Sequence, residues 1–338
     1  MRHLFSDTKI DFVGVRRYAY IFTAIWFVPG LILLLIRGLN YSIEFTGGTL
    51  VQIASQVPVD VSKLRSALDH EGVPGAEIQS FGADSEYVVR ARLSKEAPDQ
   101  DNTDATVSAV RKALDSSLGE GKYTIGRTEA VGPKVGGELR QKALTAILLA
   151  FGAILIYLAV RFEWRFGLAA VIATAHDVVA TVAFISVMHL EVSLVVVGAV
   201  LTVVGYSLND TIIIFDRVRE NLRKYRRQNL YEILNLSINE TLPRSVLTHG
   251  TTIATTLALL LLAGEVIRPF AWVMSFGIFT GTFSSIYIAA PVLLWIEKRW
   301  PGEDARGARA FDPRATAAAA AAQPVAPPRP PRTPQPTR

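Results

Sequence analysis

The chain has 338 residues, of which 50% are hydrophobic, and a formal net charge of +5 at neutral pH. This composition predicts a membrane protein with several spans and some soluble mass. The absence of cysteine excludes a disulfide framework, thiol chemistry and any cysteine-based metal site.

The first predicted elements are a polar arm and a membrane helix. Residues 1–17 form a short arm that carries several basic side chains. Residues 18–36 are a run of about 19 mostly apolar residues, long enough to cross a bilayer. The run has no small-residue cleavage site, which favours a retained helix over a removed signal peptide.

Residues 37–142 form a soluble segment that is long enough to fold alone. Its hydrophobic periodicities predict the order β-α-β-β-α-β of a ferredoxin-like, split βαβ sandwich. Asp60 is the expected N-cap of the first helix, and Gly47-Gly48 indicates a bulge or turn in the first strand. Strands are predicted at Ser42–Ala54, Ala76–Phe81, Glu86–Leu93 and Lys122–Val131, and helices at Val61–Glu71 and Thr103–Leu118. The segment has no cluster of metal ligands or nucleophiles, so we interpret it as a binding or lever module.

Five more apolar runs follow the soluble segment. They lie at residues 143–160, 166–188, 192–215, 246–263 and 270–296. The fold class is therefore a polytopic α-helical membrane protein with six transmembrane helices and an extracytoplasmic ferredoxin-like α+β domain between helices 1 and 2. Residues 143–300 form the five-helix transmembrane region that follows the soluble domain.

Basic residues predict the orientation of the chain. Arg161, Arg165 and the loop 217–242 place many positive charges on one side, whereas the short loops on the other side have almost none. Both termini are therefore expected in the cytoplasm and the soluble domain outside. The loop 217–242 is expected to form an amphipathic helix on the membrane or on the bundle. The Ala- and Pro-rich tail, residues 301–338, is expected to be disordered and cytoplasmic.

The fourth span carries two adjacent polar residues, Asn209 and Asp210, inside an apolar run. A carboxylate at membrane depth costs a few kcal/mol or more, so it usually faces the bundle interior and has a function. The alternative interpretation is a structural polar contact between helices.

Three spans carry polar residues at helical spacing, so each can turn one polar face to a common interior. They are Ala170, Thr174, Asp177 and Thr181 in the third span, Thr202, Tyr206, Ser207 and Asp210 in the fourth, and Arg244, Thr248, Thr251 or Thr252, and Thr255 in the fifth. The second span is nearly all aliphatic and is expected to face lipid or a partner.

Depth favours Arg244 as the partner of Asp210. Asp210 is displaced toward the cytoplasm, roughly 9 Å from Asp216 at a helical rise of about 1.5 Å per residue, and Arg244 enters from that same side. A buried acid that faces a movable arginine is a proton switch, because the acid takes up a proton when the arginine moves away. The alternative for Arg244 is a residue that snorkels to the membrane surface.

Five other residues have a structural interpretation, and two of them, both histidines, also have a functional one. His176 and His249 are relay candidates because histidine titrates near neutrality, although a satisfied core histidine is more common. Asp216 is interpreted as the solvated end of its helix. Gly277 and Gly281 have the spacing of close helix packing.

Several motifs of this sequence resemble the SecD/SecF family of protein-export membrane subunits, and most closely its SecF branch. They cover roughly residues 8–300. The motifs are Gly205–Asn221 with its Asn-Asp-Thr core, Glu44–Thr49, Val131–Gly136, Arg161–Arg165, His176-Asp177 and Glu240–Ser245.

The resemblance implies an accessory subunit of the Sec protein translocase in the bacterial cytoplasmic membrane, related to the resistance-nodulation-division transporters. Such a subunit works with SecD and uses the proton motive force to promote late steps of export. The implied partners are SecD, the SecYEG channel, the translocating polypeptide, YajC, YidC and membrane lipids. The resemblance implies no enzymatic activity, cofactor, metal or nucleic acid.

The resemblance also implies roles for single residues. Proton coupling falls to Asp210 and Arg244, with Asn209 and Thr211 beside the acid in the same motif. Asp177, His176 and Tyr206 are left as relay residues or as polar contacts between helices.

Two other functions are open. One is a small-molecule or lipid exporter of the same superfamily, which is disfavoured because the soluble segment leaves little room for a porter domain. An intramembrane aspartyl protease would need Asp177 and Asp210 to share a proton. Their different depths and the lack of a Gly-x-Gly-Asp motif disfavour it.

Overall fold

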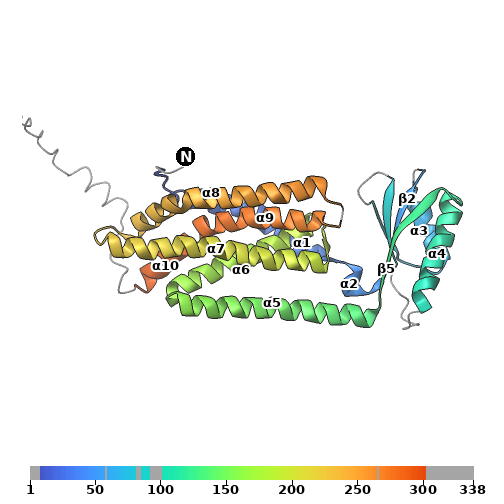
Figure 1. Ribbon diagram of the computed structural model, residues 1–338, viewed down its shortest axis with the longest axis horizontal. Helices are drawn as coiled ribbons and strands as arrows, with labels where there is room; N and C mark the ends of the chain where they lie inside the picture. Colours follow the sequence, from blue (N-terminus) through green and yellow to red (C-terminus); the bar gives the residue numbers. More distant parts are fainter. Residues whose placement is uncertain (1–7, 58, 81–84, 92–100, 265, 302–338) are drawn as a thin grey trace, which may run out of the picture.

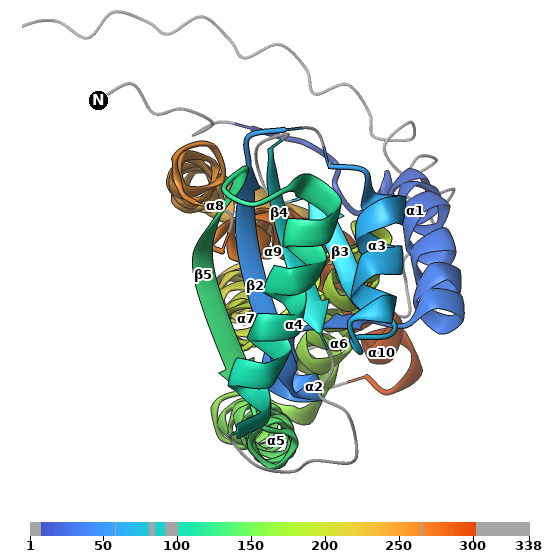
Figure 2. The same cartoon turned by 90° about the vertical axis from the view of Figure 1, so that its right-hand side faces the viewer.

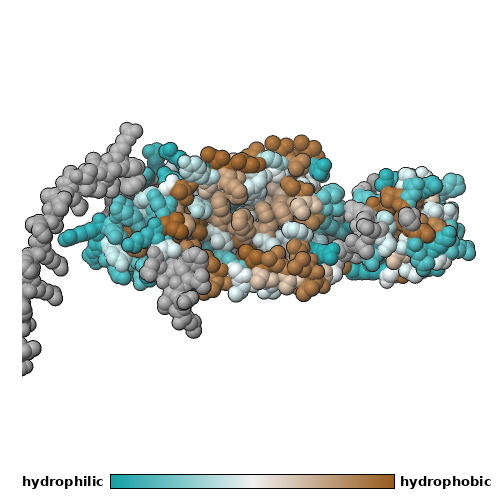
Figure 3. Space-filling view, turned by 90° about the horizontal axis from the view of Figure 1, so that it is seen from above, coloured by the Kyte–Doolittle hydropathy of each residue, from teal (hydrophilic) through white to brown (hydrophobic). Residues whose placement is uncertain are grey.

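The computed structural model describes residues 8–57, 59–80, 85–91, 101–264 and 266–301, and the predicted tail beyond residue 301 lies outside this range. Within it, six helical segments are long and apolar enough to cross a membrane, as the sequence predicted. They lie side by side as a bundle, with the soluble domain beyond one end of it (Figure 1). Hydrophobic residues cover the middle of the bundle surface, and hydrophilic residues cover its far end and much of the soluble domain (Figure 3).

The bundle is built from long helices. They are α1 (Arg16–Arg37), α5 (Pro133–Arg161), α6 (Trp164–Val187), α7 (Leu194–Lys224), α8 (Leu230–Leu262), α9 (Arg268–Ser284) and α10 (Ala290–Arg299). A π-helical turn, η1 (Ser285–Ala289), joins α9 to α10 within one span. Only 11% of the apolar stretch of α5 is buried, in agreement with the prediction that this aliphatic span faces lipid or a partner.

The structure corrects the prediction for residues 217–242. These residues do not form one separate amphipathic helix, because α7 continues to Lys224 and α8 begins at Leu230. Asn229 caps α8 in a capping box with Glu232, and Pro243 lies inside the same helix. The apolar residues that suggested a surface helix pack into the bundle, where Ile233 and Leu234 are fully buried.

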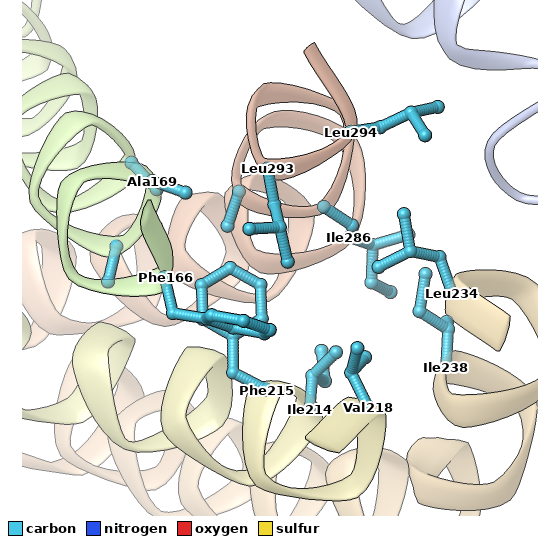
Figure 4. Close-up of a cluster of buried hydrophobic side chains, with 14 of the residues drawn as sticks. Phe166, Ala169, Ile214, Phe215, Val218, Leu234, Ile238, Ile286, Leu293 and Leu294 are labelled. Carbon is cyan, nitrogen blue, oxygen red and sulfur yellow. The ribbon is translucent and has the colours of Figure 1, made fainter. Parts of the chain in front are cut away.

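An apolar core, whose side chains are shown in Figure 4, lies beside α10 at the end of the bundle away from the soluble domain (Figure 1). Phe166 and Phe215 meet edge to face with ring centroids 5.4 Å apart. Leu293 of α10 and Ile238 of α8 belong to the same cluster. The core therefore joins α6, α7, α8 and α10 at this end.

The soluble domain (residues 48–131) has the predicted element order. It contains β2 (Gly48–Ser55), α3 (Val61–His70), β3 (Glu77–Ser80), β4 (Glu86–Ala91), α4 (Asp101–Leu118) and β5 (Tyr123–Val131). Its antiparallel sheet has the order β3-β4-β2-β5, and α3 and α4 cover the face turned away from the bundle (Figure 2). The strand order and directions are those of the predicted split βαβ sandwich.

The first predicted strand differs from the structure at its start. Residues before the glycine pair form a short strand β1 (Asn40–Tyr41) and a single helical turn α2 (Ile43–Thr46). The chain then changes direction at Gly47 and Gly48, whose φ angles are +73° and +135°. Glycine adopts such angles without strain, so the pair marks a turn into β2.

The predicted N-cap Asp60 accepts hydrogen bonds from the backbone N–H groups of Ser62 and Lys63. The Ser62 hydroxyl and the Lys63 amide lower the pKa of this carboxyl. A lowered folded-state pKa gives stability above the unfolded pKa, about 3.9, that is lost as the pH falls through the folded value. We expect Asp60→Ala to speed amide exchange in the first turn of α3 at neutral pH, measured by mass spectrometry on the full chain. The difference from the parent should shrink in acid.

Candidate functional site

Asp210 lies in a buried cluster between α7 and α8, in which only one of its two carboxylate oxygens has a hydrogen-bond partner among the described residues. Its Oδ1 accepts a hydrogen bond from the Ser245 hydroxyl at 2.6 Å. Its Oδ2 is buried and has no hydrogen-bond partner among the described residues. His249, one helical turn beyond Ser245, is also buried and its Nδ1 has no partner there. The cluster therefore keeps one carboxylate oxygen free inside the bundle.

Arg244 does not pair with Asp210 in this structure. Its side chain is exposed, and the described residues give it no ion pair or hydrogen bond. The neighbouring residue, Ser245, holds the acid instead. The predicted Asp210–Arg244 contact is thus absent from this conformation, although the charge of Arg244 acts on Asp210 from a distance. A direct contact requires that α8 rotate or shift.

The polar face of α8 is offset from the predicted one. Thr248, Thr251 and Thr255 are exposed, and the hydroxyls of Thr251 and Thr255 bond to the carbonyls of residues 247 and 251 of their own helix. The buried face consists of Ser245, His249 and Thr256, with Thr252 half-buried. Thr202 of α7 is exposed as well. The predicted stripes of the fourth and fifth spans were therefore partly wrong.

Tyr206 joins α7 to α8. Its hydroxyl lies 2.8 Å from Thr252 Oγ1 and donates to the Thr248 carbonyl at 3.1 Å. Its ring meets the His249 ring edge to face at 5.3 Å. Tyr206 thus connects α7, which carries Asp210, to α8, which carries its partner Ser245.

Asp177 lies in a second cluster, in which both of its carboxylate oxygens have hydrogen-bond partners. Its Oδ2 accepts hydrogen bonds from the hydroxyls of Ser207 on α7 and Ser284 on α9, the latter at 2.6 Å. Its Oδ1 lies 3.0 Å from Nδ1 of His176, whose ring stacks on Phe27 of α1. Asp177 is completely buried, as the predicted stripe of α6 requires. This acid ties α6 to α7 and α9.

The two residues beside Asp210 in its motif point in different directions. Asn209 is exposed on α7. Thr211 is buried, and its hydroxyl lies 2.7 Å from that of Ser285 at the start of η1. Thr211 therefore packs α7 against the π-helical turn, whereas Asn209 faces whatever surrounds the bundle.

Asp216 lies in neither cluster. It is exposed, and it pairs with Arg161 at 3.1 Å and with Arg219 at 2.7 Å. This geometry agrees with the interpretation of Asp216 as a solvated helix end. No hydrogen bond joins Asp177 to Asp210, and the described residues contain no group of His, Asp and Glu that could hold a metal ion. The shared-proton dyad of an aspartyl protease is therefore not formed here.

Sequence reasoning placed Ser207 in the polar stripe of the fourth span but missed Ser245, Ser284 and Ser285 as partners of the buried polar groups. Ser207, Ser245 and Ser284 hold the two acids, and Ser285 meets Thr211. A serine in an apolar run is a weak signal, because its hydroxyl more often bonds to its own helix. The usable signal for Ser284 is spacing, because it lies three residues after Gly281.

The fold and the two clusters define a class: a six-span membrane protein with buried acids and a soluble α+β domain between its first two spans. Comparison with known proteins gives the family. The family model "Protein export membrane protein SecD/SecF, C-terminal" matches residues 110–299, and the "SecD/SecF GG Motif" matches residues 32–59. The chain belongs to the SecD/SecF family of protein export membrane proteins.

Relatives cover almost the whole chain. It is 56% identical to the protein translocase subunit SecF of Gemmatimonas aurantiaca over 94% of this chain and 97% of that protein. It is 39% identical to SecF of Rickettsia akari over 88% and 96% of the two chains. A crystal structure of SecDF from Thermus thermophilus, named a translocon-associated membrane protein, matches with a TM-score of 0.76 at 38% identity, over 87% of this chain. The match spans 39% of that longer chain.

The exposed position of Arg244 leads to a prediction. Arg244→Gln should change the thermal stability of the purified chain little, because exposed residues without partners contribute within about 0.5 kcal/mol. It should nevertheless lower export that depends on a proton gradient if α8 brings the guanidinium to Asp210 during the cycle. Melting curves and vesicle export of the same preparation measure the two effects. A large loss of stability would contradict the exposed placement.

Proposed function

We propose that this chain is an accessory subunit of the Sec protein translocase that, with SecD, uses the proton motive force to promote late steps of protein export. Protonation of Asp210 changes the packing of α7 against α8. That change moves the soluble domain, which holds or pulls the emerging polypeptide. In this proposal the chain performs no enzymatic step.

One observation carries the proposal: Asp210 Oδ2 is buried between α7 and α8 and has no hydrogen-bond partner among the residues that the structure describes. A buried carboxylate oxygen with no donor is costly when the group is charged and much less so when it holds a proton. Asp177 differs, because both of its oxygens already have hydrogen-bond partners. Asp210 is therefore the acid that proton uptake changes most.

The topology of the proposal follows the distribution of positive charge. The basic ends of α5, α7 and α10 lie away from the soluble domain and belong on the cytoplasmic side, with both termini. The soluble domain then lies outside the cytoplasmic membrane, where exported chains emerge. The barely buried, apolar surface of α5 suits contacts with SecD or with lipid, whereas the exposed amide of Asn209 suits a polar contact with SecD. SecYEG, YajC and YidC are proposed as further contacts of the assembled complex.

Reconstitution tests the function. Vesicles that contain SecYEG and SecD, with or without this chain, would be given a proton gradient, and export of a secretory precursor would be measured. We expect the chain to raise the gradient-dependent part of export and to leave export without a gradient unchanged. Equal export in both preparations would refute the proposal. Gradient-driven flux of a small solute through the chain and SecD alone would instead favour an exporter.

A further inference from the structure

The soluble domain joins the bundle through one narrow junction, formed by residues 43–48 and 132–137. The two connections touch: a Cβ added at Gly136 of α5 would lie 3.0 Å from the Gly47 backbone nitrogen. A Cβ at Gly48 would lie 2.7 Å from the Ala91 carbonyl oxygen. The junction is thus packed backbone to backbone. Gly47, Gly48 and Gly132 are the points at which the chain enters and leaves the domain.

The first half of this junction is bonded to the connection between α6 and α7. There β1 pairs in parallel with β6 (Glu191–Val192), and the Ser42 amide donates to the Val192 carbonyl at 2.9 Å. The Glu44 carboxylate accepts a hydrogen bond from the Leu194 amide, the first residue of α7, at 2.6 Å. The start of α7 and the base of the soluble domain are therefore one connected unit.

Beyond the junction, an ion pair crosses from the domain to the bundle. Arg90, on the sheet face that α3 and α4 leave open, bonds to Glu191 of β6. The arginine side chain is 9% exposed and the glutamate 27% exposed. Around the pair, a cleft of about 390 Å³ separates the sheet from the bundle, lined by Gln52, Val88 and Arg127 on one side and by Arg268 and Trp272 on the other.

The Arg90 guanidinium lacks part of its hydrogen bonding in this pair. Nε and Nη1 of Arg90 are buried without a hydrogen bond among the described residues, and Glu77 stands 3.8 Å from Nη1. Burial raises the pKa of Glu191 against the lowering effect of Arg90, and the nearby carboxylates of Glu44, Glu129 and Glu77 raise it further. The Arg90 guanidinium thus faces two acids, Glu191 and Glu77, and a partly buried pair of this kind gains little over solvated charges.

We propose that the Arg90–Glu191 ion pair is a releasable latch that holds the soluble domain against the α6–α7 connection, and that the domain swings about the glycine junction when the latch opens. Glu191 lies between the helix that carries Asp177 and the helix that carries Asp210. A shift of α7 therefore moves one half of the latch directly. The role of the latch in export rests on the proposed function, but the position of the soluble domain can be measured without an export assay.

The first test measures position and not export. Because the chain has no cysteine, Ser66→Cys on α3 and Leu262→Cys at the end of α8 introduce two unique, exposed sites for spin labels. We expect Arg90→Gln in the full chain with SecD to broaden the label distance distribution and add longer distances. The matched control is Arg127→Gln, because Arg127 lines the same cleft but pairs with Glu129 of its own strand. Equal distributions in the Arg90→Gln variant and the parent would overturn the latch.

The second test closes the latch permanently. Arg90→Cys with Glu191→Cys would be joined by a short bismaleimide, since two long side chains in an ion pair leave their backbones too far apart for a disulfide. Joining should abolish the gradient-dependent part of export, relative to the same variant before joining. Ala54→Cys with Thr124→Cys, paired within the sheet, is the control for the reagent. Full gradient-dependent export by the joined variant would overturn the proposal. If the parent shows no such export, the proposed function fails while the distance measurement still decides the latch.

Discussion

Asp210→Asn is expected to abolish the gradient-dependent part of export and to leave export without a gradient intact. Asparagine keeps the shape of the side chain and can still accept the hydrogen bond from Ser245. Asparagine cannot take up or release a proton. The group that replaces the unpartnered Oδ2 therefore stays neutral throughout the cycle. The change therefore removes the switch and preserves the packing of α7 on α8. Export into vesicles with and without an imposed gradient measures the effect.

The matched control for this variant is Asp216→Asn. Both positions are aspartates of α7, but Asp216 is exposed and pairs with Arg161 and Arg219 at the surface. Exposed pairs contribute about 0–1 kcal/mol, so this variant should export like the parent with and without a gradient. Unchanged gradient-dependent export in Asp210→Asn would remove the acid from the mechanism. A comparable loss in Asp216→Asn would point to general damage to α7.

The sequence predicted the soluble domain well because its signals are local. The N-cap at Asp60 and the hydrophobic periodicity of the predicted strands and helices each depend on only a few residues of chain. Successive side chains of a strand point to opposite faces of the sheet. In β2, Val51 and Ile53 therefore pack under the helices, while Gln52 faces the bundle. The glycine pair indicated a bulge or a turn within the first strand, and the structure shows a turn into β2 there.

The candidate site was less predictable, because polarity does not say which face of a membrane helix is buried. On α6 the stripe through Thr174 and Asp177 was right, since the acid itself fixed the buried face. On α8 the threonines repeat at the same helical spacing, yet they satisfy their hydroxyls on their own backbone and remain exposed. Contacts between distant segments, such as Arg90 with Glu191, leave no local pattern in the sequence.

Gly281→Ala is expected to destabilise the bundle by about 1–3 kcal/mol through overpacking. An added Cβ would lie 2.8 Å from the Ser207 Cβ and 3.1 Å from its Cα, atoms that no side-chain rotation can move. Relief requires α7 and α9 to separate, and Ser207 is the residue of α7 that donates to Asp177. The substitution should therefore weaken both the helix contact and the bonds of the buried acid. Thermal unfolding of the chain in lipid nanodiscs, followed by tryptophan fluorescence, measures the loss.

Gly250→Ala separates this steric effect from the general preference of helices for alanine. Gly250 lies in α8, and a Cβ there would meet nothing within 4 Å. Alanine favours a helix over glycine by up to about 1 kcal/mol, so this variant should be as stable as the parent or more so. Since the same propensity gain offsets part of the clash at Gly281, the difference between the two variants reports the clash itself. Two variants of equal stability would mean that α7 and α9 can separate at Ser207 without cost, and Asp177 would then not be held by the close contact that the structure shows.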